Sequence, residues 1–225
     1  MLWRSSKKID SVISFCSRLQ RIRQSRGYGV HSPFAFDLIT NVIHSPHIFY
    51  AFDDIRKALT EYGFDKHTVT SFHLLSYRLV RYFNVKNILE INSGKGVNTL
   101  FLLAPAADIR CSCIEEDAVA NAIAKNLREK TGLHRERVSL LPSPGKQRYD
   151  AIFVHLKEET DLSVETLLDL SHDGTFWVFH PIHRSWGKQF WRDFVHDERT
   201  MITFDMKETG IIFIRPGYNK LHYYV

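Results

Sequence analysis

Residues 92–96 place an asparagine and two glycines directly after a run that reads as a buried strand. Gly94 and Gly96 lack a Cβ, so they permit a positive φ and a close approach of backbone to a ligand, and Asn92 tolerates the left-handed conformation better than most residues. The apolar run 97–103 is predicted to be a buried helix whose free N–H groups point back into this turn. A strand, a turn and a helix N-terminus therefore converge on one predicted ligand crevice.

A carboxylate ends the next predicted strand, at residues 109–114. Glu115 follows this strand, 21 residues after Gly94. In open parallel sheets, ligands bind beyond the carboxyl ends of the strands, and an acid at this position commonly accepts hydrogen bonds from the two hydroxyls of a ribose. Glu116 is expected to point elsewhere, and Asp117 is expected to cap the following helix. We therefore expect Glu115 to bind a ribose.

The glycine spacing excludes two nucleotide-binding motifs. A dinucleotide fingerprint counted from residue 92 requires a glycine at position 97, where this chain has Val97. A P-loop is also excluded, because no Gly-Lys-Ser/Thr sequence follows the first strand.

Three histidines stand at the ends of later predicted strands. His155 follows a strand at 150–154, and His180 and His183 end or follow one at 174–180. If these strands are neighbours, the imidazoles meet at one edge of the crevice, where they could act as a general base toward an acceptor hydroxyl or amine, or bind a soft metal. The alternative is three unrelated histidines that are hydrogen-bonded at strand ends.

Strand-like and helix-like segments alternate from residue 86 onward, which predicts an α/β fold with a Rossmann-like, doubly wound and mostly parallel sheet. Strands are expected at 86–91, 109–114, 137–141, 150–154 and 174–180, with helices near 97–104, 117–131, 159–170 and 185–196. Four residues join segments 200–205 and 210–215, which therefore form an antiparallel C-terminal hairpin. Helices are also expected at 34–43, 52–62 and 71–83.

The basic character of the chain belongs to its N-terminal segment. The formal net charge is +5, but residues 1–30 carry seven Lys/Arg against one acid, so the remainder is nearly neutral. Apolar residues between 9 and 22 recur at helical spacing, which predicts a basic amphipathic helix within residues 1–26. This helix is expected either to pack on the domain with a solvated cationic face or to bind an anionic partner, such as RNA or a membrane surface.

Composition also bounds the class of protein. No window approaches the ~20 apolar residues of a membrane span, and the N-terminus lacks the apolar core of a secretory signal. Cys16, Cys111 and Cys113 are too few and too irregularly spaced for a disulfide framework or a zinc site. The expected location is the reducing cytoplasm.

The run Glu90-x-Asn92-x-Gly94-x-Gly96 resembles the E/D-x-G-x-G-x-G motif of class I S-adenosylmethionine-dependent methyltransferases. The likeness extends over residues 68–225, and more narrowly the chain resembles small bacterial methyltransferases of the O-methyltransferase group, in which a segment like residues 29–34 precedes the core. The resemblance implies a methyltransferase-like domain at 68–225 and a helical N-terminal extension at 1–67.

The resemblance implies S-adenosyl-L-methionine as the cofactor, with its ribose on Glu115. Glu90 would act on the amino group of the cofactor through the loop or a water, and Lys95 would either answer the methionine carboxylate or face solvent. Thr70 and Ser71 match a position where related enzymes approach the cofactor. The methionine part would lie over the turn formed by Asn92, Ser93, Gly94, Lys95 and Gly96.

The chain also departs from the pattern of this family. The third strand ends without the acid that related enzymes often carry there. Metal-dependent members carry carboxylate or amide ligands at the positions where this chain has His155 and His180. Magnesium prefers oxygen ligands, so a magnesium site of that type is not expected. The expected activity is methyl transfer to an unidentified acceptor, with a small hydroxylated molecule preferred. The alternatives are a methyltransferase that acts on RNA through the basic N-terminal segment and a degenerate fold that serves as a binding module.

Overall fold

The computed structural model describes residues 21–24, 28–132 and 135–225. The predicted basic helix within residues 1–26 therefore lies largely outside the described residues. Residues 21–24 are helical. None of the described helices is both long and apolar enough to cross a membrane.

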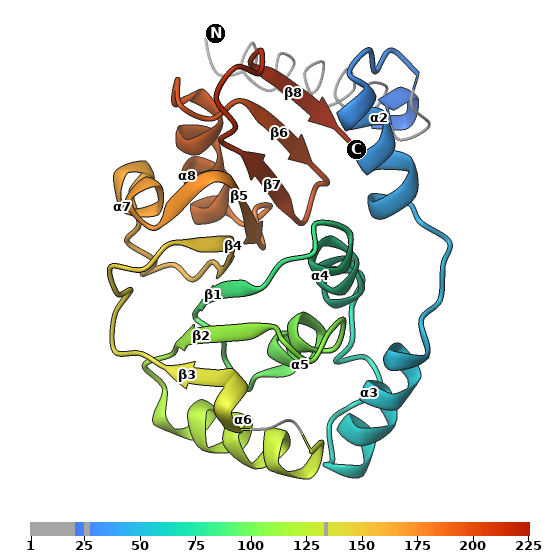
Figure 1. Cartoon of the computed structure of the whole chain (residues 1–225), viewed down its shortest axis with the longest axis vertical. Coiled ribbons are helices and arrows are strands. Elements are labelled where there is room, and N and C mark those ends of the chain that lie inside the picture. Colours follow the sequence, from blue (N-terminus) through green and yellow to red (C-terminus); the bar gives the residue numbers. More distant parts are fainter. Residues whose placement is uncertain (1–20, 25–27, 133–134) are drawn as a thin grey trace, which may run out of the picture.

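An eight-stranded sheet with the order β3-β2-β1-β4-β5-β7-β6-β8 forms the centre of the molecule (Figure 1). Neighbouring strands from β3 to β5 are parallel, and β7 is antiparallel to both β5 and β6. The predicted α/β fold and its antiparallel C-terminal hairpin are confirmed. The strands are β1 (Asn87–Ile91), β2 (Arg110–Ile114), β3 (Val138–Leu140), β4 (Tyr149–His155), β5 (Ser171–His180), β6 (Ile202–Asp205), β7 (Gly210–Phe213) and β8 (Leu221–Tyr224).

Strand β8 was not predicted from the sequence. It pairs in parallel with β6 at the edge of the sheet, where Leu221 N–H donates to Met201 O and Val225 N–H donates to Asp205 O. The segment Leu-His-Tyr-Tyr lacks the continuous apolar run of the central strands. In agreement with this sequence, only one of its four residues is buried. Its strand conformation depends on backbone pairing with β6, and such pairing requires no pattern of apolar residues in the local sequence.

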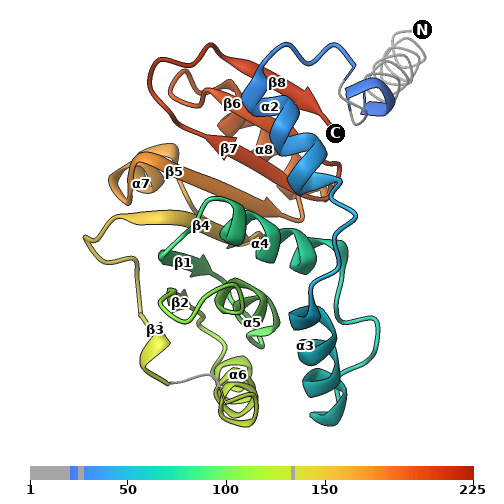
Figure 2. The same ribbon diagram turned by 45° about the vertical axis from the view of Figure 1, so that its right-hand side comes forward.

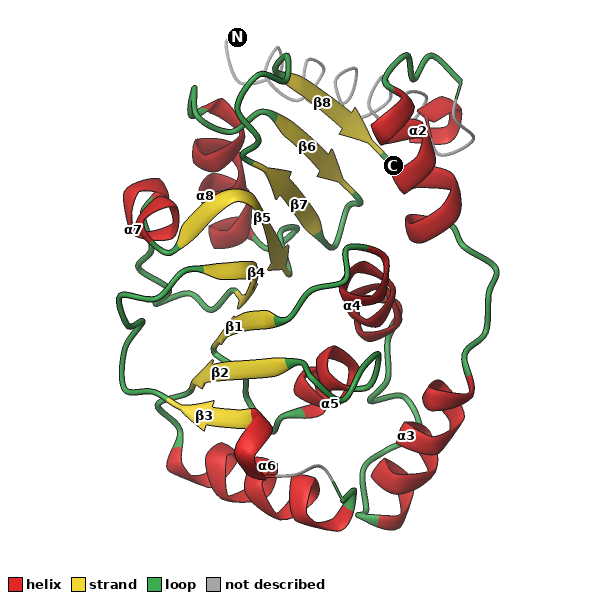
Figure 3. Ribbon diagram, viewed as in Figure 1, coloured by secondary structure: helices red, strands yellow, loops and turns green. Residues whose placement is uncertain are grey.

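The helices follow the predicted order, except that a short 3-10 helix at 135–137 was not expected and that two of the expected helices differ in type or length (Figure 3). The helix expected at 34–43 is a short α-helix that continues as one π-helical segment, and the helix expected at 159–170 covers only residues 164–169. The bounds are α2 (Pro33–Leu38), the π-helical η1 (Ile39–Ile43), α3 (Tyr50–Glu61), α4 (Ser71–Tyr82), α5 (Val97–Leu103), α6 (Ala118–Lys130), the 3-10 helix η2 (Arg135–Arg137), α7 (Val164–Asp169) and α8 (Ser185–His196).

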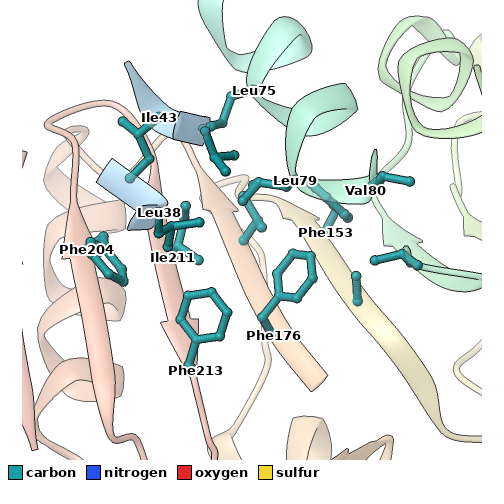
Figure 4. Close-up of a cluster of buried hydrophobic side chains, with 14 of the residues drawn as sticks. Leu38, Ile43, Leu75, Leu79, Val80, Phe153, Phe176, Phe204, Ile211 and Phe213 are labelled. Atoms are coloured by element: carbon teal, nitrogen blue, oxygen red, sulfur yellow. The ribbon is translucent and has the colours of Figure 1, made fainter. Parts of the chain in front are cut away.

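Helices cover both faces of the sheet, as expected for a doubly wound fold (Figure 2). On one face, Leu38 of α2 packs with Leu79 of α4 against Phe176 and Phe213 of the sheet (Figure 4). On the other face, α7 and α8 pack against Trp177 and other aromatic side chains. The segment 33–43 therefore belongs to the same hydrophobic core as the sheet, while the division of the chain at residues 67 and 68 stays a prediction.

Strands β1, β2, β4 and β5 all end at the same edge of the sheet. The chain runs outward from β1 to β3 in one direction and from β4 to β5 in the other, so the order of strands reverses between β1 and β4. In open α/β sheets this reversal opens the crevice in which ligands bind. The residues that follow these strands are therefore the candidates for a functional site.

Candidate functional site

The turn after β1 has the backbone conformation that its residue types predict. Asn92, Gly94 and Gly96 have φ values of 57°, 56° and 76°, all in the left-handed region. The N–H of Ser93 donates to Ile114 O at 3.2 Å, and the Gly96 N–H donates to Ser93 O at 3.1 Å. These bonds fix the turn against the end of β2.

The two glycines of this turn serve different purposes. A Cβ on Gly96 would lie 2.9 Å from the Cβ of Ala124, so Gly96 allows α5 and α6 to pack closely. A Cβ on Gly94 would meet no atom within 4 Å. The space above Gly94 is therefore open to a ligand, whereas the space above Gly96 is already filled by the protein.

Glu115 lies at the end of β2 with its carboxylate against the turn. Its Oε2 accepts a hydrogen bond from Gly94 N–H at 2.7 Å, and its Oε1 accepts one from Asp117 N–H at 3.0 Å. Lys157 Nζ, from the loop after β4, lies 3.2 Å from Oε1. The side chain of Glu115 is only 1% exposed, although the residue as a whole is partly accessible through its backbone.

These contacts set the ionisation of Glu115. Burial raises its pKa, but the hydrogen bonds from the Asp117 and Gly94 N–H groups and the ammonium of Lys157 outweigh burial, so the pKa is lower than that of a free glutamate. The carboxylate is therefore charged at neutral pH. As predicted, Asp117 caps α6, since its side chain accepts from Val119 N–H, and the neighbouring Glu116 is exposed.

Glu90 and His155 form a carboxylate–imidazole pair between β1 and β4. Glu90 is fully buried, and its Oε1 lies 2.8 Å from His155 Nε2. The carboxylate also accepts hydrogen bonds from Asn98 Nδ2 at 2.9 Å and from Thr99 Oγ1 at 2.6 Å, both on α5. Asn92 adds a link to β4, because its Nδ2 donates to His155 O at 2.8 Å. The motif residue Glu90 thus orients His155.

His180 lies beside His155, as the sequence predicted for neighbouring strands. The two residues are register partners on β4 and β5. The ring of Phe72 stacks on His180 with centroids 4.3 Å apart and meets the edge of His155 at 5.4 Å. Burial and the nearby His155 lower the pKa of His180 to about 4, so this imidazole is neutral at neutral pH.

His183 does not join this pair. Its Nδ1 lies 2.7 Å from Glu208 Oε2, an ion-pair distance outside good hydrogen-bond geometry, and its side chain lines a separate cavity beside α8. The structure therefore brings two of the three predicted histidines together and places the third apart.

A different histidine, His73 on α4, belongs to the cluster and was missed. Its Nδ1 lies 3.0 Å from both the N and the Oγ1 of Thr70, which caps α4. Burial and His155 lower the pKa of His73 to about 4. The available signal was its position three residues after Thr70, which directly precedes the helix expected at 71–83, because a side chain at that position can reach back to the helix N-terminus.

The remaining predicted cofactor residues lie around the same turn. Ser93 is buried, and Lys95 is exposed, with no hydrogen bond or ion pair to its side chain among the described residues. Thr70 and Ser71 are exposed at the start of α4, and Ser71 lines a small cavity with Phe72. Lys157 is a second residue that the sequence did not suggest, since a lysine two residues after a strand carries no specific pattern.

Two cysteines lie beneath Glu90 on β2. Sγ of Cys113 is 3.9 Å from Glu90 Oε2 and 3.7 Å from Sγ of Cys111, so the three side chains offer a compact ligand set. The contact with Cys113 and burial raise the pKa of Cys111 well above that of a free thiol. All three side chains are buried within the sheet, so we describe this cluster as part of the core.

The edge of the sheet fits a nucleoside with an attached amino acid in three respects. Glu115 offers a charged acceptor beside the turn, and the backbone of Gly94 faces open space. Asn98 Oδ1 is buried beside Glu90 without a hydrogen-bond partner among the described residues. The carboxylate of Glu115 already accepts three hydrogen bonds, so a ribose would have to replace Lys157.

Solved methyltransferases share this fold. An O-methyltransferase from Bacillus cereus in complex with S-adenosylhomocysteine aligns with a TM-score of 0.55 and 16% identity, over 74% of this chain and 91% of its own. The O-methyltransferase TomG from Streptomyces achromogenes, in complex with S-adenosylmethionine, gives 0.54 and 17% over 75% and 91%. The S-adenosylhomocysteine-bound methyltransferase PaMTH1 from Podospora anserina gives 0.59 and 16% over 82% and 97%.

The similarity is one of structure. No protein-family profile matches the chain, and no curated protein matches its sequence. At these identities the comparisons show that the chain has the Rossmann-like fold of O-methyltransferases.

Proposed function

We propose that this protein is a cytoplasmic S-adenosylmethionine-dependent methyltransferase that methylates a small hydroxylated molecule. The contact between Glu115 and the N–H of Gly94 carries the proposal, because it places a charged carboxylate against an open glycine turn at the reversal of strand order. Fold neighbours from Bacillus cereus and Streptomyces achromogenes, solved in complex with S-adenosylhomocysteine and S-adenosylmethionine respectively, add support.

Glu115 would hold the ribose hydroxyls after Lys157 has moved away. Asn92, Ser93 and Gly94 would form the surface under the methionine part, while Gly96 would keep α5 close to α6 behind that surface. Lys95, which is exposed, would be free to reach the carboxylate of the methionine part. Glu90 is enclosed by Asn98, Thr99 and His155, so any action on the cofactor amino group would pass through the loop or a water.

His155 is the residue best placed to accept the proton of an acceptor hydroxyl. When Nε2 donates to Glu90, the lone pair lies on Nδ1, and the neighbouring carboxylate stabilises the imidazolium that forms. When bound, S-adenosylmethionine supplies a methyl group on a sulfonium that is already activated for transfer. The protein then has to align the acceptor, exclude water and remove one proton.

His180 would contribute as a neutral neighbour, because its pKa of about 4 leaves it uncharged at neutral pH. Phe72 stacks on His180, meets His155 edge-on, and would form an apolar wall for the acceptor. His183 lies apart with Glu208, so we assign it no part in proton transfer.

Calorimetry with S-adenosylhomocysteine tests the proposal directly. The Glu115→Ala variant should bind more weakly by ~1.5–3 kcal/mol, the range of charge-assisted hydrogen bonds. Glu116→Ala is the matched control, because it removes the same charge from the adjacent exposed position. Equal affinities of the two variants would remove Glu115 as the ribose ligand.

A degenerate fold that only binds a partner is the second candidate. The ion pair between Lys157 and Glu115 favours it, because the protein itself occupies the ribose-binding carboxylate. An absence of S-adenosylhomocysteine and S-adenosylmethionine binding at millimolar concentration would select this candidate.

RNA as the acceptor is the remaining alternative, and its motivation is the basic N-terminal segment. Transfer of a labelled methyl group to an RNA oligonucleotide, compared with a panel of phenols and alcohols, separates the two acceptors. Substitution of Arg4, Lys7 and Lys8 by glutamine should abolish only transfer to RNA.

A further inference from the structure

A cavity of about 610 Å³ lies between α8 and the last strands of the sheet. Trp191 of α8 forms its floor, and the ring packs so closely on β7 that a Cβ on Gly210 would lie 2.4 Å from Trp191 Cζ3. The walls come from α8, the turn between β6 and β7, the end of β8 and the loop after β5. The lining residues are Arg21, Ile182, His183, Lys188, Trp191, Arg192, Val195, His196, Asp205, Lys207, His222 and Tyr224.

Cationic side chains dominate the walls of this cavity. Lys188 and Arg192 stand one turn apart on α8, and Lys207 lines the same cavity from the turn between β6 and β7. None of these three side chains forms an ion pair or a hydrogen bond with any part of the chain that the structure describes. Lys207 has a φ of 70°, a conformation that lysine seldom adopts outside constrained turns.

Asp205 is the acidic residue among those that line the cavity, and it does not neutralise these three positive charges. Asp205 Oδ1 accepts from Arg21 Nη2 at 3.0 Å, and Arg21 also donates to Val225 O at 2.8 Å, so this pair ties residues 21–24 to the end of the sheet. Lys188, Arg192 and Lys207 therefore remain as unpaired positive charges around one concave space.

Such an arrangement favours an anion. Positive charges that line one cleft repel each other, and the field inside a cleft with low-dielectric walls is stronger than on a flat surface. Guanidinium and ammonium groups are the side chains that proteins use most for phosphate, through forked and point-charge contacts respectively. Volumes of roughly 300–1,000 Å³ accommodate small molecules, so the cavity admits a multiply charged ligand.

From this geometry we infer that the cavity beside α8 binds a ligand that carries two or more phosphate groups, through Lys188, Arg192 and Lys207. The phosphates could belong to a free polyphosphate or nucleotide, or to the backbone of a nucleic acid, and both offer the same chemistry to these side chains. The site does not include Glu115, Glu90 or His155. It therefore stands whether or not the chain is a methyltransferase.

Calorimetry on the full-length protein at low salt, without any methyl donor, tests this inference. The probes are inorganic tripolyphosphate and a ten-nucleotide single-stranded RNA. The test variant carries Lys188→Gln, Arg192→Gln and Lys207→Gln. The control carries Lys57→Gln, Lys66→Gln and Lys125→Gln, which removes the same number of exposed charges from α3, the turn after it and α6.

The test variant should bind tripolyphosphate at least about tenfold more weakly than the wild type, because charge-assisted contacts are lost, and the control should be unchanged. If the RNA binds the wild type more tightly than tripolyphosphate does, and if the test variant binds the RNA more weakly, the source of the phosphates is a nucleic acid. Equal thermal midpoints of all proteins would show that folding is intact.

Three results would overturn the inference. The first is no binding of either probe to the wild type, and the second is an equal loss of affinity in the test and control variants. The third is binding that depends only on Arg4, Lys7 and Lys8, which would assign phosphate binding to the N-terminal segment. The separate titration with S-adenosylhomocysteine keeps failure of this site distinct from failure of the methyltransferase proposal.

Discussion

Lys157 Nζ lies 3.2 Å from Glu115 Oε1, and this contact joins the loop after β4 to the end of β2 across the turn that follows β1. The three strands are neighbours, so both side chains reach the same point although they are far apart in the sequence. The ammonium of Lys157 compensates the negative charge of the nearly inaccessible Glu115 carboxylate, and it occupies the position that we assign to a ribose.

Replacement of Lys157 by glutamine should strengthen binding of S-adenosylhomocysteine by up to about fivefold. The lysine side chain is 39% exposed, so its ion pair contributes no more than ~1 kcal/mol, and the ligand would no longer have to displace it. Calorimetry measures the change. Weaker binding in the variant would mean that Lys157 contacts the ligand rather than competes with it.

Alanine at positions 94 and 96 should separate ligand binding from packing. Gly94→Ala should cost ~1–2 kcal/mol of stability from its left-handed backbone alone, but it should impair binding of S-adenosylhomocysteine. Gly96→Ala adds overpacking against Ala124 and should cost ~2–5 kcal/mol. Urea denaturation gives the two stabilities. A normal affinity in Gly94→Ala would show that the open space above residue 94 is not the binding surface.

A hydrogen-bond acceptor at position 90 should matter more for folding than the charge of the side chain. Glu90→Ala leaves Asn98 Nδ2 and Thr99 Oγ1 buried without an acceptor, which should lower the free energy of unfolding by ~2–4 kcal/mol. Glu90→Gln keeps an oxygen at this place and should lose less stability. Equal losses in urea denaturation would contradict this account. In an active enzyme, Glu90→Gln should reduce turnover through the loss of charge beside His155.

Stability should fall as the pH is lowered from about 6.5 toward 4. The pKa values of His73 and His180 are about 4 in the folded protein, whereas unfolded histidines titrate near 6.5, so only the unfolded state takes up these protons in that range. Each of the two histidines should account for a loss of ~1–3 kcal/mol in the free energy of unfolding over this pH range. This range is lower than the full pKa shifts would give, because both rings are partly exposed to solvent.

Urea denaturation at several pH values measures this dependence. His73→Gln and His180→Gln should each make it shallower, while His196→Gln, an exposed position on α8, should leave it unchanged. A wild-type profile that is flat between pH 6.5 and 4 would show that the two rings are solvated.

Local patterns were enough to predict the centre of the fold. The buried run of β1, the glycine turn and the acid after β2 are each specified within a few residues, so the strand, the turn and the position of Glu115 at the end of β2 were predicted. The role of Glu115 as a ribose ligand stays a prediction. The hairpin was predicted because a four-residue connection permits no other arrangement. His155 and His180 were paired correctly once their strands were assumed to be neighbours.

Contacts between distant segments account for what the sequence did not reveal. Lys157 meets Glu115 only because of the order of strands, and His73 reaches the cluster only because α4 packs on this side of the sheet. Strand β8 depends on the free edge of β6. His183 looked equivalent to His180 in the sequence, but the chain turns away after β5 and takes it to Glu208.

The close packing of Trp191 on Gly210 also sets how near α8 lies to β7, beside the cavity to which we assign phosphate binding. Any residue larger than glycine at position 210 would push the indole outward and lift α8 from the sheet. Lys188 and Arg192 would move with the helix, so their positions relative to Lys207 would change. The absence of a side chain at position 210 thus lets α8 pack closely on the sheet, and this packing holds two of the three positive charges at the cavity.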